Sequence, residues 1–157
     1  MVDDHTPKPV ATTLVEILRW RALHQGSDVA FTLLKDGEEE ELSLSYGELD
    51  TLCRRVAARL QDLDAVGQPV LLVYPPGRDF LVGYLGCLYA GAIAVPIYPP
   101  DPRRMERTLP RFQAIATDCG ATVALTQAAN LGVVQAIGAY APDLKSMRWA
   151  SSDDLPP

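Results

Sequence analysis

The sequence lacks the short motifs that mark most catalytic, cofactor and metal sites. No C-x-x-C pair accompanies its three cysteines, and its two histidines, His5 and His24, are not at metal-ligand spacing to any of them. The glycine-rich phosphate patterns G-x-G-x-x-G and G-x-x-x-x-G-K-[ST] are absent, as is the G-x-S-x-G signature of serine hydrolases. Paired carboxylates occur only as adjacent runs. The residues alone therefore predict no catalytic, cofactor-binding or metal-binding site.

Basic residues are also scarce, since 14 Lys and Arg against 20 Asp and Glu give a net charge of −6. Binding to nucleic-acid phosphates needs a basic excess, so we expect no nucleic-acid partner. Cys53, Cys87 and Cys119 lie in apolar surroundings, which predicts three buried thiols in a reducing compartment rather than a redox or zinc site. The acidic N-terminus resembles no signal peptide, so we expect a cytoplasmic protein.

An uncharged stretch covers residues 80–100, which is 21 residues and enough to cross a bilayer. Three glycines and Pro96 interrupt it. We therefore predict no membrane span, but a buried helix over residues 79–90 that ends at Gly91, followed by a buried strand over residues 92–98.

Two capping boxes and a hairpin signal organise the first third of the chain. Thr13 and Glu16 have capping-box spacing, so a helix is expected to begin at Thr12 or Thr13. Strands are expected over residues 29–34 and 40–44, around a turn at residues 35–38. The acidic run 38–41 is interpreted as a solvated hairpin edge rather than a cation site. The first helix is expected to have an apolar face of Leu14, Ile17, Leu18 and Leu23.

Ser45 and Glu48 form the second capping box, at the start of a helix with apolar residues at steps of three and four. These apolar residues are Leu49, Leu52, Val56, Leu60 and Leu63. From residue 45 onward, helical and strand patterns alternate. Beside the helix and strand already predicted, the pattern indicates strands over residues 70–74, 121–125 and 146–150, and helices from near Thr108–Pro110 to Gly120 and over residues 130–140. Because these strands are apolar on both faces, we predict an α/β fold with a largely parallel sheet covered by helices on both faces.

Proline-rich loops follow two of the predicted strands, at residues 74–77 and 98–102. Ligands of such sheets bind at the carboxyl ends of strands, so these loops are the places to look for a site. Each proline removes an N–H donor that a phosphate cradle needs. We therefore interpret the two loops as rigid segments that shape the edge of the sheet, rather than as loops that bind a nucleotide phosphate.

Arg104, Arg107 and Arg111 fall at helical spacing, with Arg103 beside them. One interpretation is an anion patch that receives a phosphate or an acidic partner. The other is a solvated or ion-paired surface, and this is the interpretation that the residues favour.

Several stretches together resemble adenylate-forming enzymes, the superfamily of acyl and aryl ligases and adenylation domains. Residues 44–50 (LSYGELD) resemble the first core motif of that superfamily, and residues 86–96 (GCLYAGAIAVP) resemble the second. Residues 97–104 (IYPPDPRR) and 73–77 (VYPPG) are similar to the fatty acyl-AMP ligase branch in particular. Residues 12–23 and 109–115 are similar to that branch as well, and the resemblance covers residues 10–150.

The resemblance implies an enzyme that activates a fatty acid with ATP and magnesium to an acyl-adenylate. The acyl group then passes to an acyl carrier protein in polyketide, lipopeptide or lipid biosynthesis, and transfer to coenzyme A is disfavoured. The family's Ser/Thr/Gly-rich phosphate loop and catalytic lysine have no counterpart in these residues, so no catalytic or ATP-binding residue is assigned.

We therefore expect the N-terminal portion of a fatty acyl-AMP ligase, which is inactive and binds no cofactor by itself. Residues 1–9 would be a loose lead-in, residues 10–150 the incomplete N-terminal α/β subdomain, and residues 151–157 a linker. Its partners would be the remainder of the enzyme or, through exposed apolar surface, a second copy. Two alternatives are a naturally short scaffold or partner-binding module of the same fold, and a fragment of an acyl-CoA synthetase.

Overall fold

The computed structural model describes residues 10–35, 37–132, 134, 141, 144 and 146–155, without the side chains of residues 35, 40, 41 and 102. The chain forms two compact units, residues 1–52 and 53–157, and the division falls within helix α2 (Tyr46–Asp62). The expected lead-in at residues 1–9 lies outside the described residues.

The first unit begins with helix α1 (Leu14–His24), whose capping box is confirmed. Glu16 N donates to Thr13 Oγ1 at 3.1 Å, and Thr13 N donates to Glu16 Oε2 at 3.2 Å. The predicted apolar face is wrong in extent, because Leu18 is buried whereas Leu23 is 80% exposed. Leu23 follows Leu18 by five residues, which places it about 140° around the helix from Leu18.

The predicted hairpin is confirmed and each strand is one residue longer than expected at one or both ends. Strand β1 (Val29–Lys35) pairs antiparallel with β2 (Glu39–Ser45), and Gly37 in the turn has a φ of +81°. Glu38 and Glu39 of the acidic run are exposed, and no cluster of His, Cys, Asp or Glu among the described residues is arranged to hold a metal ion.

The second capping box is also present. Glu48 N donates to Ser45 Oγ at 3.3 Å, and Ser45 N donates to Glu48 Oε2 at 2.9 Å, so α2 begins directly at the end of β2. Of the predicted apolar residues of α2, Leu49, Val56 and Leu60 are almost completely buried. The periodicity of three and four therefore identified the core side of this helix correctly.

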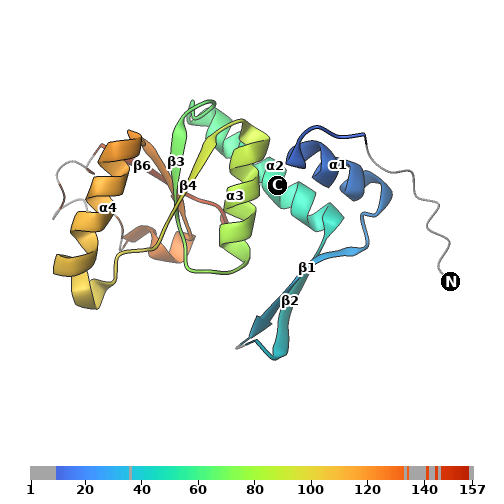
Figure 1. Ribbon diagram of the computed structural model, residues 1–157, viewed down its shortest axis with the longest axis horizontal. Helices are drawn as coiled ribbons and strands as arrows, with labels where there is room; N and C mark the ends of the chain where they lie inside the picture. The colour runs from blue at the N-terminus through green and yellow to red at the C-terminus, as the bar shows by residue number, and fades with distance from the viewer. Residues whose placement is uncertain are drawn as a thin grey trace. The chain divides into compact units, whose positions relative to one another are not determined.

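The second unit contains a parallel four-stranded sheet, as predicted. Its strands are β3 (Pro69–Val73), β4 (Ile93–Ile97), β5 (Val123–Thr126) and β6 (Arg148–Ser151), in the order β4-β3-β5-β6. Figure 1 shows helix α3 (Arg78–Ala90) and helix α4 (Met105–Cys119) on opposite sides of this sheet. The chain crosses the sheet in one direction from β3 to β4, and in the other direction from β4 past β3 to β5. Because crossovers between parallel strands have the same hand, the helices in these two connections lie on opposite faces of the sheet.

A hydrophobic core lies between the sheet and α4. Leu71 and Val73 of β3, Ala124 of β5 and Phe112 and Ala116 of α4 form its centre. The residues that alternate with them in β3, Val70 and Leu72, are fully buried on the opposite face, toward α3. The central strands are therefore apolar on both faces, which is what the uninterrupted apolar runs predicted.

The prediction of a buried strand over residues 92–98 is wrong in its burial. Strand β4 lies at the edge of the sheet, and Ile93 is 56% exposed. Ile93 N donates across to Gln68 O at 2.9 Å, so the alternation of the backbone points the nitrogens of Ala94 and Pro96 toward the open edge. Pro96 therefore removes a hydrogen-bond donor that the sheet does not use.

The predicted start of the helix near Thr108–Pro110 is also wrong. Helix α4 begins at Met105, after a short 3₁₀ turn over Pro102–Arg104, and Pro110 lies inside it. Proline is most common in the first turn of a helix, and this preference placed the predicted start too late. The predicted helix over residues 130–140 falls mostly outside the described residues, and β6 runs from Arg148 to Ser151 rather than over residues 146–150.

Residues 80–100 divide as predicted, because α3 ends at Gly91, which has a φ of +74°. Among the described residues, no helix combines the length and the apolar character that crossing a bilayer requires.

The three cysteines differ in burial. Cys53 and Cys87 are fully buried as predicted, whereas Cys119 is partly exposed, and none of the three forms a disulfide. Burial raises the pKa of Cys87 to about 12. Because the thiolate is the reactive form, Cys87 is chemically inert in the folded chain.

We expect a thiol reagent at about pH 8 to modify Cys119 first and to leave Cys87 unmodified until the chain unfolds, because a pKa near 12 leaves only about one thiolate in 10⁴. Mass spectrometry of peptides after timed alkylation, with and without denaturant, measures this order. Modification of Cys87 as fast as Cys119 in the native chain would contradict the assignment.

Candidate functional site

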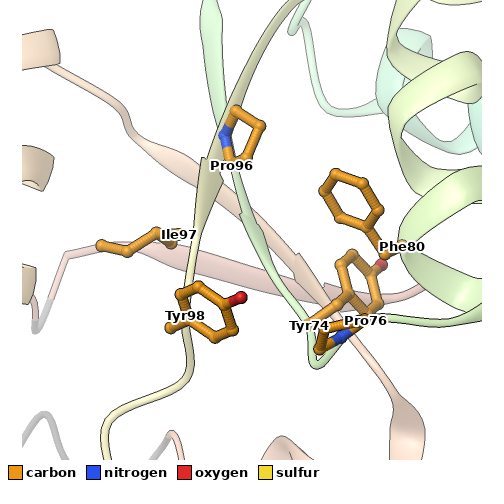
Figure 2. A pocket seen from close by; sticks show the side chains of 6 residues that line it. All are labelled: Tyr74, Pro76, Phe80, Pro96, Ile97 and Tyr98. Carbon is orange, nitrogen blue, oxygen red and sulfur yellow. The ribbon is translucent and has the colours of Figure 1, made fainter.

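The carboxyl ends of β3 and β4 frame a small pocket of about 180 Å³. Its walls come from the two proline-rich loops that the sequence singled out and from the strand and helix beside them. Figure 2 shows Tyr74, Pro76 and Phe80 on one side of the pocket and Pro96, Ile97 and Tyr98 along β4 on the other.

The lining of this pocket is aromatic and aliphatic. Prolines supply no N–H donor, and none of the six lining side chains carries a charge. Tyr98 is 75% exposed, whereas Tyr74 is buried. This lining offers neither the backbone N–H groups nor the cations that hold a triphosphate, so the pocket suits an apolar group.

Tyr74 forms a fixed wall of the pocket. Its ring lies so close to α3 that a Cβ on Gly83 would be 3.0 Å from Tyr74 Cε2. The hydroxyls of Tyr74 and Ser152 are both buried, and neither has the geometry of a hydrogen bond with a described residue. Burial raises the pKa of Tyr74 well above its ordinary range, while the nearby Ser152 hydroxyl acts in the opposite direction. Tyr74 is therefore a neutral, structural side chain.

Polar side chains do gather at the carboxyl ends of β3 and β5, where the connections of the sheet diverge. Thr126 Oγ1 donates to Val73 O at 2.9 Å, and Gln127 Nε2 donates to Asp79 Oδ2 at 2.5 Å. Asn130 Nδ2 in turn donates to Gln127 Oε1 at 3.0 Å. These groups satisfy one another and fix the loop after β5 to the first turn of α3.

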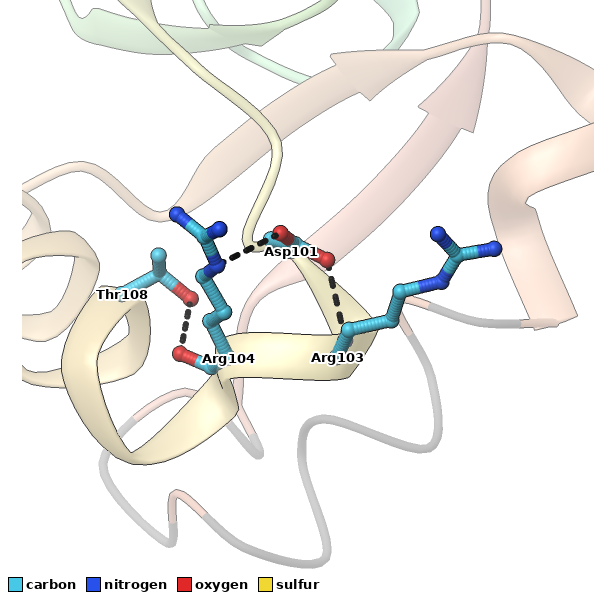
Figure 3. A network of polar contacts seen from close by, with 4 residues as sticks. All are labelled: Asp101, Arg103, Arg104 and Thr108. Atoms are coloured by element: carbon cyan, nitrogen blue, oxygen red, sulfur yellow. Dashed lines mark hydrogen bonds and ion pairs between the residues drawn. The ribbon is translucent and has the colours of Figure 1, made fainter.

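Of the four arginines that the sequence singled out, Arg103 and Arg104 lie in the 3₁₀ turn before α4 (Figure 3), and Arg107 and Arg111 lie in the first half of α4. Asp101 caps the preceding turn, since Arg103 N donates to Asp101 Oδ1 at 2.9 Å. Arg104 Nε lies 4.0 Å from Asp101 Oδ2, at the limit of an ion pair. The arginines therefore form the solvated or ion-paired surface that the sequence favoured: Arg104 is weakly paired with Asp101, and Arg103, Arg107 and Arg111 are exposed to solvent.

A second, wider cavity of about 520 Å³ lies along β6 and was not anticipated. Its lining combines cationic, anionic and apolar side chains from α2, β6 and the residues that follow β6. The lining includes Arg54, Arg55 and Arg59, Asp62 and Asp154, Trp149 and Leu155. Because its members lie about 90 residues apart in the sequence, no local pattern signals this cavity.

Comparison with known proteins identifies the family. The model of the family "AMP-binding enzyme" matches residues 18–155. The medium-chain-fatty-acid–[acyl-carrier-protein] ligase JamA of Moorena producens is 39% identical over 150 residues, which cover 95% of this chain and 25% of JamA.

Two solved structures of Legionella pneumophila proteins are also similar. Its fatty acid AMP ligase has a TM-score of 0.79 and 34% identity, over 94% of this chain and 24% of that protein. A fatty acyl-adenylate ligase in complex with acyl adenylate and pyrophosphate has a TM-score of 0.75 and 34% identity over the same shares.

The chain thus spans about a quarter of the length of JamA and of the Legionella ligases. The family match covers most of the chain, and the fold is the one that the resemblance implied. The chain belongs to the AMP-binding enzyme family, in which the predicted resemblance to the fatty acyl-AMP ligases is confirmed.

Proposed function

We propose that this chain is part of a fatty acyl-AMP ligase, which activates a fatty acid with ATP and magnesium and passes the acyl group to an acyl carrier protein. The single observation that carries this proposal is the 39% identity with JamA over 95% of the chain. The TM-score of 0.79 with the Legionella fatty acid AMP ligase supports the same branch.

Within such an enzyme, we propose that residues 10–150 are a supporting subdomain, with residues 1–9 as a lead-in and residues 151–157 as a linker. The pocket at the ends of β3 and β4 does not fit a triphosphate, because its lining lacks cations and is rich in proline. The residues that bind ATP and react with the fatty acid are therefore expected in other parts of the enzyme.

The test is ATP–pyrophosphate exchange in the presence of medium-chain fatty acids. The isolated chain should show background exchange only. A chimera in which this chain replaces the matching quarter of JamA should exchange within about tenfold of JamA, because the two segments are 39% identical over 95% of this chain. JamA is the positive control, and JamA without that segment is the negative control.

Two outcomes would contradict the proposal. Exchange by the isolated chain would show that it contains a complete site. A folded chimera without exchange would show that the segment does not support this chemistry. The acyl acceptor separates the two enzyme classes. Transfer of the acyl group to a carrier protein would indicate a fatty acyl-AMP ligase, and transfer to coenzyme A would indicate the alternative, an acyl-CoA synthetase.

A further inference from the structure

Four arginines of this acidic chain form a surface that we call the arginine surface and define as Arg103, Arg104, Arg107 and Arg111. These four residues are among only 14 basic residues in the chain, and they lie within nine consecutive positions. Glu106 is the one acidic residue between them.

The geometry of α4 keeps the arginine surface away from the core. Met105, Leu109, Phe112 and Ala116 point toward the sheet and pack into or against the hydrophobic core. Arg107 and Arg111 are four residues apart, so they share the opposite side of α4, about 6 Å apart along its axis. Arg103 and Arg104 precede the helix, in the 3₁₀ turn.

The fold makes little use of these charges. Among the described residues, the carboxylate partner of the arginine surface is Asp101, which lies 4.0 Å from Arg104 Nε, and the side chains of Arg104 and Asp101 are 68% and 45% exposed. Arg107 and Arg111 repel each other at a spacing of four residues, and cations in the first turn oppose the helix dipole. The arrangement therefore destabilises the free helix, and an anionic partner would relieve that repulsion.

We propose that the arginine surface docks the acyl carrier protein that receives the acyl group, by pairing with carboxylates on that protein, an inference that rests on the proposed function. JamA is named as a ligase that acts on an acyl carrier protein. Guanidinium groups pair with carboxylates through two parallel hydrogen bonds, so several arginines spread over one surface suit a partner with several separate carboxylates. A single phosphate, by contrast, needs donors that converge on one point.

The position of the arginine surface supports this docking. Asp101 and Arg103 follow Tyr98, the exposed residue at the pocket, by three and five positions. A carrier protein held by α4 therefore stands beside the carboxyl edge of the sheet, where ligands of such sheets bind. Attraction between opposite charges also speeds the encounter and makes it dependent on salt.

The test is binding between the 157-residue chain and the acyl carrier protein on which JamA acts, measured by fluorescence anisotropy. The double variant Arg107→Glu/Arg111→Glu is compared with Arg19→Glu/Arg148→Glu, which changes two exposed arginines outside the arginine surface and makes the same change in net charge. We expect the first pair to weaken binding at least about tenfold and the control pair to weaken it less than about twofold. Binding of the unchanged chain should weaken between about 50 mM and about 300 mM NaCl.

Folding is checked by circular dichroism, and Arg107→Gln/Arg111→Gln serves as a milder variant with an intermediate expected effect. Equal losses in the two charge-reversal pairs would overturn the proposal, because net charge alone would explain them. Absence of binding would overturn it as well, and so would displacement of the carrier protein by coenzyme A, which would indicate a nucleotide-phosphate site.

The binding experiment is independent of adenylation. A chimera that exchanges pyrophosphate, together with a chain that does not bind the carrier protein, would remove this inference and leave the proposed function in place. Carrier binding together with a folded but inactive chimera would remove the proposed function instead.

Discussion

Replacement of Phe112 by alanine should lower the free energy of unfolding by about 3–5 kcal/mol. Phe112 is 1% exposed and belongs to the core between α4 and the sheet. Its ring stacks on Trp149 of β6, with ring centroids 6.2 Å apart and an angle of 15° between the planes. Truncation therefore removes a large buried apolar surface and an aromatic pair, and leaves a cavity that the neighbouring strands cannot fill.

Urea unfolding followed by far-UV circular dichroism measures this loss, because the side chains of the core do not contribute strongly to that signal. Thr117→Ala, an exposed position on the same helix, is the matched control and should change stability by less than about 0.5 kcal/mol. Phe112→Leu should be intermediate, because it retains much of the apolar volume. A Phe112→Ala variant as stable as the unchanged chain would show that α4 does not pack on the sheet in this way.

The second large effect concerns the contact between α3 and the second half of α2. A Cβ on Gly86 would lie 2.4 Å from Val56 Cγ1 and 2.6 Å from Val56 Cβ. Val56 is fully buried and branched at Cβ, so it has no rotamer that moves out of the way. We expect Gly86→Ala to lower the free energy of unfolding by about 1–3 kcal/mol through overpacking.

A double-mutant cycle isolates this contact. Val56→Ala creates space at the same point, so the double variant Gly86→Ala/Val56→Ala should lose less stability than the sum of the two single variants, by about 1 kcal/mol or more. Gly132→Ala is the control for glycine replacement, because a Cβ on Gly132 meets no atom within 4 Å. Additive single effects would mean that α2 and α3 are not in close contact at this point.

Features that depend on a few neighbouring residues could be predicted from the sequence. Each capping box depends on a hydroxyl and a carboxylate three residues apart, and both are present at Thr13–Glu16 and Ser45–Glu48. The left-handed glycine that ends α3, Gly91, was predictable for the same reason. The parallel sheet followed from the apolar runs of its central strands.

Features that depend on strand order could not be predicted in this way. The apolar run in β4 has the same pattern as a central strand, and only the pairing of β3 with both β4 and β5 reveals that β4 is at the edge. The bond between Gln127 and Asp79 joins residues 48 positions apart. The arginines were recognised by their spacing, but their exposure and weak pairing with Asp101 required the three-dimensional structure.

Pro96 affects whether two molecules can associate by pairing strands at the open edge of β4. A strand that approached β4 from outside would find no donor at Pro96, so stacking of molecules through this edge is discouraged. Among the described residues, β6 forms the other edge of the sheet, and it contains no proline. Arg148 N and Ser152 N donate to Thr122 O and Thr126 O, so the nitrogen of Ser151 points away from β5. Addition of a strand is therefore less hindered at β6, and Ser151→Pro would remove an outward donor there without breaking the pairing with β5.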